Sequence, residues 1–166
     1  MRKPPEIESK PLRIVRVLSV SPIENDHACL FDIFQRSHWN LYTDRTWALF
    51  LGRTLEAAVD ALRGGLIQVV ISERDLLPGT WREILEHTLL LPVPPLLIVT
   101  SRLADERLWA EALNLGAFDV LAKPFETDEV IRIFSSAWRH WENRQEIKLQ
   151  RLRDRRAVEQ WNAAAG

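Results

Sequence analysis

The sequence contains a single cysteine, Cys29, which excludes an internal disulfide and a cysteine zinc site. So little cysteine is typical of a reducing compartment, and we expect the protein to be cytoplasmic. Lys and Arg number 22 against 23 Asp and Glu, and at a net charge of −1 no overall field attracts nucleic acid or an anionic membrane. Proline or polar residues interrupt the longest apolar runs, and no apolar stretch follows the first residues, so neither a membrane span nor a secretory signal is expected.

The remaining composition is that of a globular domain with an appendage. Hydrophobic residues make up 46% of the 166 residues and charged residues 27%, which is normal for a chain that buries a core. We interpret residues 1–12, which are polar and contain three prolines, as a flexible lead-in. Residues 13–141 are predicted to form the domain, and residues 142–166 a helical extension.

Strand-like and helix-like segments alternate along the chain. Short, apolar, β-branched segments predict strands over 14–20, 67–72, 96–100 and 118–122, and residues 39–43 alternate as a strand would. Helical spacing or capping residues predict helices over 24–36, 80–88, 104–115 and from 127 to about 160, with a further helix ending over 57–62. This alternation predicts an α/β fold with a doubly wound, five-stranded parallel sheet covered by helices on both faces.

Residues 45–54 are ambiguous. The pair Arg45-Thr46 recurs eight residues later as Arg53-Thr54, and either pair is suited to precede the next helix. We interpret the stretch as an insertion, which is either an extended second strand or a lengthened helix.

Polar side chains gather where the predicted strands end, and in a doubly wound sheet the carboxyl ends of the strands form the site. They are Ser21, Glu73, Thr100 and Lys123, and Pro22 and Pro124 follow the first and the last of them. The turn after the first strand contains no glycine, which disfavours a phosphate-cradling nucleotide or flavin enzyme. No catalytic Ser/His/Asp or Cys/His set is evident, and the histidines are scattered. We therefore predict a protein that is not an enzyme and has no cofactor and no metal site.

Residues 115–125, which read LGAFDVLAKPF, carry a specific resemblance to the receiver domains of bacterial response regulators. The threonine Thr100 and the loop ERDLLPG over 73–79 resemble the same family. The resemblance covers roughly residues 13–141 and implies the strand order 2-1-3-4-5. It also implies a role in two-component (phosphorelay) signalling.

Three parts of the family's phosphorylation switch differ in this sequence. In the family, two acidic residues after strand one and an acceptor aspartate hold Mg²⁺, whereas here the positions are Ser21, Pro22 and Glu73. Glutamate is longer than aspartate, which misplaces the nucleophile. The stiff Val120 replaces the switch aromatic residue. The resemblance thus implies that Mg²⁺ binding is weak or lost.

Other nearby acids are poor substitutes for the missing groups. Glu24 and Asp26 are interpreted as first-turn helix residues rather than replacement ligands, and Asp75 is disfavoured as a stand-in acceptor. Thr100, Lys123 and Pro124 do match the family. We therefore predict a pseudo-receiver that is not phosphorylated, in which a Glu73–Lys123 ion pair holds one state. The alternatives are a solvated Glu73 with no state to hold, and a phosphorylatable single-domain response regulator with atypical site residues.

The expected partners are a histidine kinase or a downstream effector, with no nucleic acid and no membrane. Trp109, Trp138 and Trp141 lie on the two helices that receivers commonly use for partner contact, and for these three an interface and a core role stay open. A homodimer through these helices and the C-terminal extension is a further expectation. The basic cluster over 151–156 is interpreted as a solvated helix face, and the extension either as a helix that pairs with a partner or as a frayed tail.

Overall fold

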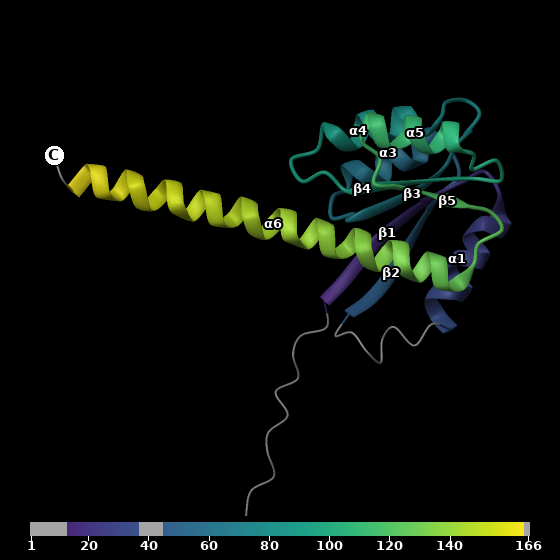
Figure 1. The fold of residues 1–166 in the computed structure, drawn as a ribbon, viewed down its shortest axis with the longest axis horizontal. Helices are drawn as coiled ribbons and strands as arrows, with labels where there is room; N and C mark the ends of the chain where they lie inside the picture. Colours follow the sequence, from purple (N-terminus) through teal and green to yellow (C-terminus); the bar gives the residue numbers. More distant parts are fainter. Residues whose placement is uncertain (1–12, 37–44, 165–166) are drawn as a thin grey trace, which may run out of the picture.

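A computed structural model describes residues 13–36 and 45–164 of the chain, and it contains one five-stranded sheet. All neighbouring strands pair in parallel, in the order β2-β1-β3-β4-β5, which confirms the predicted topology (Figure 1). The strands are β1 (Arg13–Val20), β2 (Arg45–Gly52), β3 (Val69–Glu73), β4 (Leu96–Ser101) and β5 (Asp119–Ala122).

The ambiguous stretch over 45–54 is an extended second strand. β2 pairs with β1 over eight residues, from Arg13 beside Arg45 to Val20 beside Gly52. The helix after it begins only at Leu55, because the Thr54 side chain caps it by accepting a hydrogen bond from the backbone N–H of Ala57. The strand expected over 39–43 lies outside the described residues.

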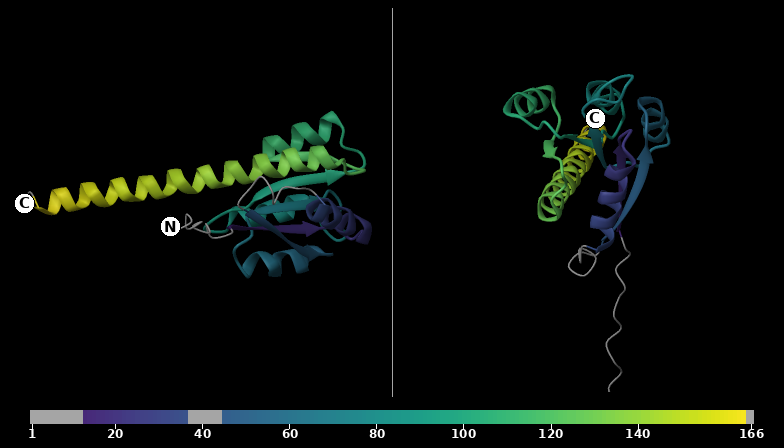
Figure 2. Two further views of the ribbon diagram at one scale, coloured as in Figure 1. Left: turned by 90° about the horizontal axis from the view of Figure 1, so that it is seen from below. Right: turned by 90° about the vertical axis from the view of Figure 1, so that its right-hand side faces the viewer.

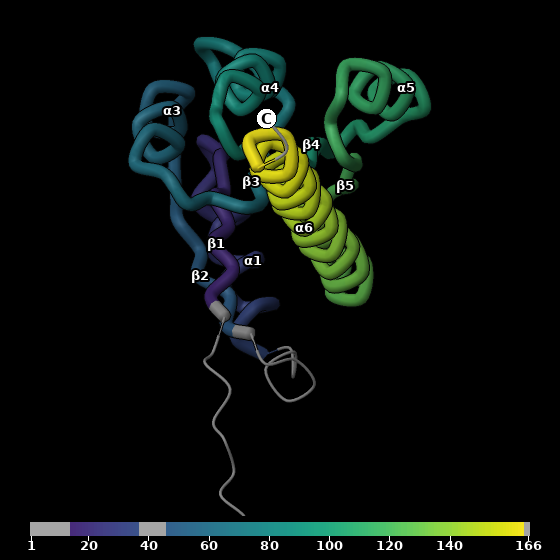
Figure 3. Tube along the Cα trace, turned by 90° about the vertical axis from the view of Figure 1, so that its left-hand side faces the viewer, coloured from purple at the N-terminus to yellow at the C-terminus, as the bar shows by residue number. Residues whose placement is uncertain are grey.

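Helices cover both faces of the sheet. They are α1 (Glu24–Arg36), α3 (Leu55–Arg63), α4 (Trp81–Leu89), α5 (Glu106–Leu115) and α6 (Thr127–Ala164). α3, α4 and α5 pack on one face and α1 and α6 on the other, as the view along the sheet in Figure 3 shows. Each face has its own core cluster, and β3 and β4 are buried over their whole lengths because both sides are covered.

Local sequence fixes where these helices begin and end. Thr80 and Glu83 form a capping box at the start of α4, and the Asp105 side chain accepts a hydrogen bond from the backbone N–H of Leu108 at the start of α5. Gly116 ends α5 at a φ of 108°, a left-handed conformation that glycine adopts without a Cβ clash.

α6 is 38 residues long and only its first part is packed. Val130, Ile133, Phe134 and Ala137 are fully buried against the sheet, and Trp138 is nearly so. From Glu146 to Ala164 all side chains are exposed, and the helix projects beyond the sheet as a straight rod (Figure 2). Across the described ranges, no helix is both long enough and apolar enough to cross a membrane.

Candidate functional site

The carboxyl ends of the central strands are held together by backbone hydrogen bonds. The N–H of Ser21, after β1, donates to the carbonyl of Gly52 at 3.0 Å. The N–H of Arg74, after β3, donates to the Thr100 carbonyl at 2.9 Å, and the N–H of Lys123, after β5, donates to the Ser101 carbonyl at 3.0 Å. The side chains that leave these ends are therefore fixed relative to one another.

Lys123 lies at the centre of a buried charge cluster at this edge. Its ammonium group forms an ion pair with Glu73 and another with Asp26, whose Oδ2 lies 2.6 Å from Nζ. The side chains of Lys123, Asp26 and Glu73 are only 5%, 9% and 11% exposed. Two carboxylates around one ammonium leave a formal charge of −1 in a poorly solvated place, which makes the lysine essential to both acids.

Ser21 supports this cluster from the end of β1. Its hydroxyl donates a hydrogen bond of 2.6 Å to Oδ2 of Asp26 and accepts one of 3.1 Å from the backbone N–H of Ile23. The hydroxyl thus turns the chain into α1 and holds the Asp26 carboxylate toward Lys123. Pro22, the other substituted position, is exposed and offers no side-chain donor or acceptor.

His27 supports the same edge one residue further along α1. It is buried, and its Nε2 lies 3.0 Å from the Ser21 carbonyl while Nδ1 lies 2.9 Å from the Ser19 hydroxyl. A carbonyl only accepts, so Nε2 carries the proton in this arrangement and, in the neutral ring, Nδ1 accepts from Ser19. The ring therefore anchors the start of α1 to β1.

Asp26, interpreted from sequence as a first-turn helix residue, and His27, which was not singled out, both lie at the site. Asp26 does lie in the first turn of α1, as predicted, but its carboxylate also reaches into the site, which was not expected. The available signal was topological, because the N-terminus of α1 lies at the same edge as the strand ends. An acid five residues after Ser21 therefore reaches Lys123 from the start of α1.

Among the other predicted switch positions, Thr100 and Val120 are buried, whereas Pro124 is exposed. The Thr100 hydroxyl donates 2.9 Å to the Leu121 carbonyl, so it is bonded to the neighbouring strand rather than to Lys123. Val120 is completely buried in the core beneath α5, where it packs with Leu108 and Ala112. The Lys123–Pro124 peptide bond is cis.

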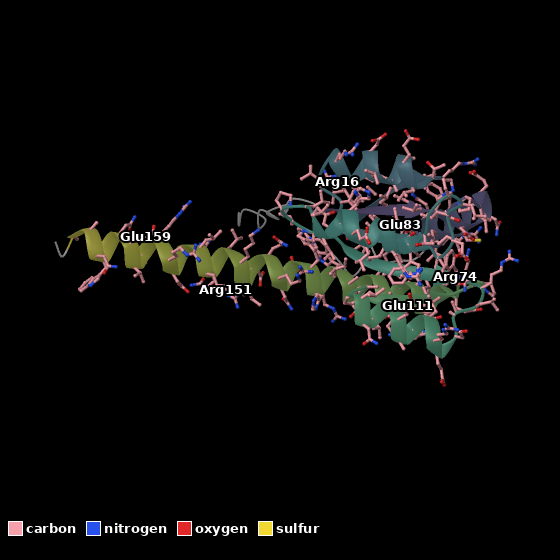
Figure 4. All side chains as sticks on the ribbon, turned by 90° about the horizontal axis from the view of Figure 1, so that it is seen from above. Arg16, Arg74, Glu83, Glu111, Arg151 and Glu159 are labelled. Atoms are coloured by element: carbon pink, nitrogen blue, oxygen red, sulfur yellow. The ribbon has the colours of Figure 1, made fainter. Side chains whose placement is uncertain are left out.

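Asp75 belongs to a separate surface group. Its carboxylate accepts a 2.9 Å hydrogen bond from Nε of Arg74 and is about half exposed. That hydrogen bond is the largest cause of the raised pKa of Arg74. In Figure 4, Arg74 lies on the outer surface, toward Glu111 of α5, which itself forms an ion pair with Arg82 of α4. Asp75 is thus engaged outside the cluster of Glu73, Asp26 and Lys123.

The donor set at this edge does not match the Mg²⁺ site of the family. Magnesium prefers several oxygen ligands in an octahedron, with water completing the shell. Here both carboxylates are paired with an ammonium group, and Ser21 directs its hydroxyl proton at Asp26. No group of three or more metal-ligating side chains is found within residues 13–36 and 45–164. A crevice of about 260 Å³ opens beside Asp26 and Lys123, lined also by Cys29, Arg102 and Phe125.

The three tryptophans singled out from sequence differ in exposure. Trp138 is 6% exposed and stacks on Trp141, with their rings 5.5 Å apart. Trp141 and Trp109 are half-buried, and Trp109 packs against the core beneath α5. Trp138 therefore presents little surface, while Trp109 and Trp141 each keep an accessible edge.

Neither a described protein family nor a curated protein matches the sequence. By structure, the chain is similar to the signal receiver domain of a Vibrio parahaemolyticus protein described as a LuxO repressor, with a TM-score of 0.68 and 18% identity over 82% of this chain and 98% of that chain. It is also similar to the beryllofluoride-activated NtrC4 receiver domain dimer, with a TM-score of 0.65 and 17% identity over 76% of this chain and 98% of that one.

A third similar structure is the receiver domain of a Saccharomyces cerevisiae response regulator, crystallised with a histidine phosphotransfer protein. The TM-score is 0.58, with 15% identity over 73% of this chain and 86% of that chain. The shared strand order and helix placement show that this chain has the receiver-domain fold.

Proposed function

We propose that this protein is a pseudo-receiver, a signalling module that binds other proteins without being phosphorylated on an aspartate. The observation that carries the proposal is the double ion pair of Lys123 with Glu73 and Asp26, at an edge where Ser21 and Pro22 supply no carboxylate. The proposal places the protein among non-enzymatic components of two-component signalling in a bacterial cytoplasm.

The ion pairs explain how one state would be held. In a phosphorylated receiver, as the resemblance implies, the lysine contacts the phosphoryl oxygens. In this chain the Glu73 and Asp26 carboxylates already bind the Lys123 ammonium group. Removing one partner of a buried pair costs about 3–5 kcal/mol, so the ammonium group does not leave them readily. The cluster thereby imitates an occupied site permanently.

The same contacts oppose phosphoryl transfer. Glu73 carries its carboxylate one methylene further from the backbone than an aspartate would, and that carboxylate is bound to Lys123. In-line transfer depends on a nucleophile held in position and on charge neutralisation by a metal. We propose that Mg²⁺ binding is weak or lost because the acids are already paired.

Phosphoryl uptake measured by intact mass tests this proposal. The wild-type chain, incubated with acetyl phosphate and Mg²⁺, is expected to keep its mass. Glu73→Asp alone is also expected to stay unmodified, because Ser21 and Pro22 still lack carboxylates. The triple variant Ser21→Asp, Pro22→Asp and Glu73→Asp rebuilds the acidic set and serves as the positive comparison. A stoichiometric phosphoryl adduct on the wild-type chain would overturn the proposal.

One specific observation favours the alternative of an atypical phosphorylatable receiver. Thr100, Lys123 and Pro124 are the residues that the resemblance associates with phosphoryl binding, and the Lys123–Pro124 peptide bond is cis. An adduct on the wild-type chain that disappears in Asp75→Asn would identify Asp75 as the acceptor. An adduct that is lost only in Glu73→Gln would identify Glu73.

The partner we propose is another signalling protein, either a histidine kinase or a downstream effector. The similar yeast receiver domain was crystallised with a histidine phosphotransfer protein, and the NtrC4 receiver domain was solved as a dimer. Nucleic acid and membrane partners are not part of the proposal, since the chain is nearly neutral overall.

We propose that a second copy of the chain is a further partner, through α5, α6 and the exposed end of α6. The nineteen helical residues 146–164 are all exposed in the single chain, and a helix of that length gains most of its stability from packing. Light scattering on the full chain and on a chain truncated after Asn143 measures the mass of each. An unchanged oligomeric state after truncation would remove the extension from the dimer proposal.

A further inference from the structure

A second hollow lies at the opposite edge of the sheet from the charge cluster. Its volume is about 430 Å³, which is within the range of roughly 300–1,000 Å³ typical of small-molecule sites. It forms where the turn after α3, the segment after α4 and the middle of α6 meet. Its walls are mainly apolar and include Leu62, Ile67, Leu91, Val93 and the indole of Trp141.

A buried carboxamide supplies a fixed polar group in this pocket. Gln68 is 8% exposed, and its Oε1 accepts a hydrogen bond of 2.6 Å from the backbone N–H of Arg16 in β1. That bond assigns the oxygen, since a carboxamide NH₂ in its place would oppose another donor. No hydrogen bond from Nε2 of Gln68 is found among the described residues, although the side chain lines the pocket. Its two N–H donors are thus available to a ligand.

The pocket rim adds a second carboxamide and one charge. Gln145 of α6 lines the rim, and no hydrogen bond of its side chain is found in the described part of the chain. Arg63 is the one charged residue among the described residues of the lining, and it is exposed and paired with Asp60. Apolar walls with two carboxamides and a neutralised cation suit an uncharged polar group on an apolar body.

We propose that this pocket binds a small apolar molecule that carries a neutral carbonyl or carboxamide acceptor. The acceptor receives the Nε2 hydrogens of Gln68, and the apolar body lies between Ile67, Leu91 and Trp141. The site is separate from the Glu73–Lys123 cluster, because none of the described residues that line it belongs to that edge.

Ligand binding here would act on α6. Trp141 and Gln145 are partly buried residues near the point where α6 leaves the folded body, and Lys148, one turn later, donates a 3.1 Å hydrogen bond to the Pro92 carbonyl beside the pocket. A ligand between them ties α6 to the segment after α4. Hydrogen exchange of the α6 amides over 142–149 is therefore expected to slow when the pocket is filled.

Amide and indole N–H signals of the full chain, followed by NMR during titration with phenylacetamide, test the proposal. We expect saturable shifts of the Trp141 indole and of the Gln68 and Val93 amides, with a dissociation constant on the order of 1 mM for so small a ligand. The indole of Trp81, which is enclosed in the core at 0% exposure, is the internal control and is expected not to move. Absence of saturable shifts from a folded chain at tens of millimolar probe would overturn the proposal.

Matched variants distinguish binding in this pocket from nonspecific binding of an apolar probe elsewhere on the protein. Val93→Trp fills the pocket from a position that is 41% exposed, and it is expected to weaken binding at least tenfold. Leu89→Trp, at a 59% exposed position outside the lining, is expected to leave binding unchanged. Equal affinity of the two variants would overturn the location. Toluene provides the apolar body without an acceptor, and binding as tight as that of phenylacetamide would overturn the assigned role of Gln68.

Discussion

Two regions of this molecule contrast in how exposed their charged side chains are. At the carboxyl edge of the sheet, Glu73, Asp26 and Lys123 are buried and each contacts another charge. On the projecting part of α6, charges are numerous but solvated, as Arg151 and Glu159 illustrate in Figure 4. The first region has few charges that depend on one another, and the second has many that do not.

Solvent accounts for the difference between the two regions. Exposed ion pairs contribute about 0–1 kcal/mol and are screened over roughly 8–10 Å at physiological salt. Buried charges lose hydration, so each needs its partner, and removing one partner is far more costly than the pair is stabilising. The chain thus concentrates its electrostatic sensitivity in three side chains of the domain. The following predictions test this contrast, from the largest expected effect to the smallest.

Two lysines, the buried Lys123 and the exposed Lys148, give the largest contrast. Lys123→Met leaves two buried carboxylates without their cation and is expected to lower the free energy of unfolding by about 3–5 kcal/mol. Lys148→Met removes an exposed ammonium whose one hydrogen bond within the described residues goes to the Pro92 carbonyl, so a loss of about 0.5 kcal/mol or less is expected. Urea denaturation measures both. Equal losses would show that the cluster is solvated after all.

Ser21 tests the contrast through a hydrogen bond. Ser21→Ala removes the donor to the Asp26 carboxylate, and a hydrogen bond to a buried charged group is worth about 1.5–3 kcal/mol. Asp32→Asn, on the helix α1 that also carries Asp26, breaks an exposed i,i+4 pair with Arg36. This change is expected to cost only about 0.3–0.5 kcal/mol. Thermal unfolding ranks the two variants, and the reverse ranking contradicts the contrast.

The capping box of α4 sharpens the contrast, because it holds the carboxylate of Glu83 at the surface with hydrogen-bond donors in fixed positions. Thr80→Ala is expected to cost about 1 kcal/mol. The hydrogen bond from the Thr80 side chain is the first cause of the lowered pKa of Glu83. A lowered carboxyl pKa gives stability that is present above the ordinary glutamate value and is lost as pH falls through the folded value. The difference between wild type and Glu83→Gln should therefore shrink on acidification, as chemical denaturation at several pH values can show.

Asp119 should give the smallest effect, and its effect on stability should change with pH in the opposite direction to that of Glu83. Burial is the first cause of its raised pKa, against a hydrogen bond from the Val120 N–H and the charge of Arg132. A raised carboxyl pKa means that stability falls as pH rises from the ordinary aspartate value to the folded value. Asp119→Asn keeps the acceptor for Val120 and is expected to raise neutral-pH stability by about 0.5 kcal/mol at most, since solvent screens the site. Below the ordinary value the gain should vanish, and a gain independent of pH contradicts the account.

The fold was predictable because its signals are local. Short apolar segments with β-branched residues, such as 96–100, favour buried strands, and Thr80, Gly116 and Thr127 mark helix boundaries directly. The stretch over 45–54 stayed ambiguous since its residues suit both a strand and a helix. Its outcome depended on pairing with β1, which is a contact that no local pattern encodes.

The site was predictable in part. Glu73 and Lys123 follow strands whose ends must meet in a parallel sheet, so their pairing could be expected from topology. Asp26 was considered but not assigned to the site, because its reach into the site depends on how far α1 leans over β1, and on the hydroxyl that Ser21 offers it. Gln68 and Trp141, which are 73 residues apart and line one pocket, carried no recognisable pattern.

The exposed end of α6 also affects how this protein moves in water. At about 1.5 Å per residue, residues 146–164 extend the molecule by roughly 28 Å beyond its folded body. An elongated particle experiences more friction than a sphere of equal mass, so it elutes early from a sizing column and tumbles slowly about its short axes. A lone copy will therefore elute as if it were heavier than its 19.3 kDa.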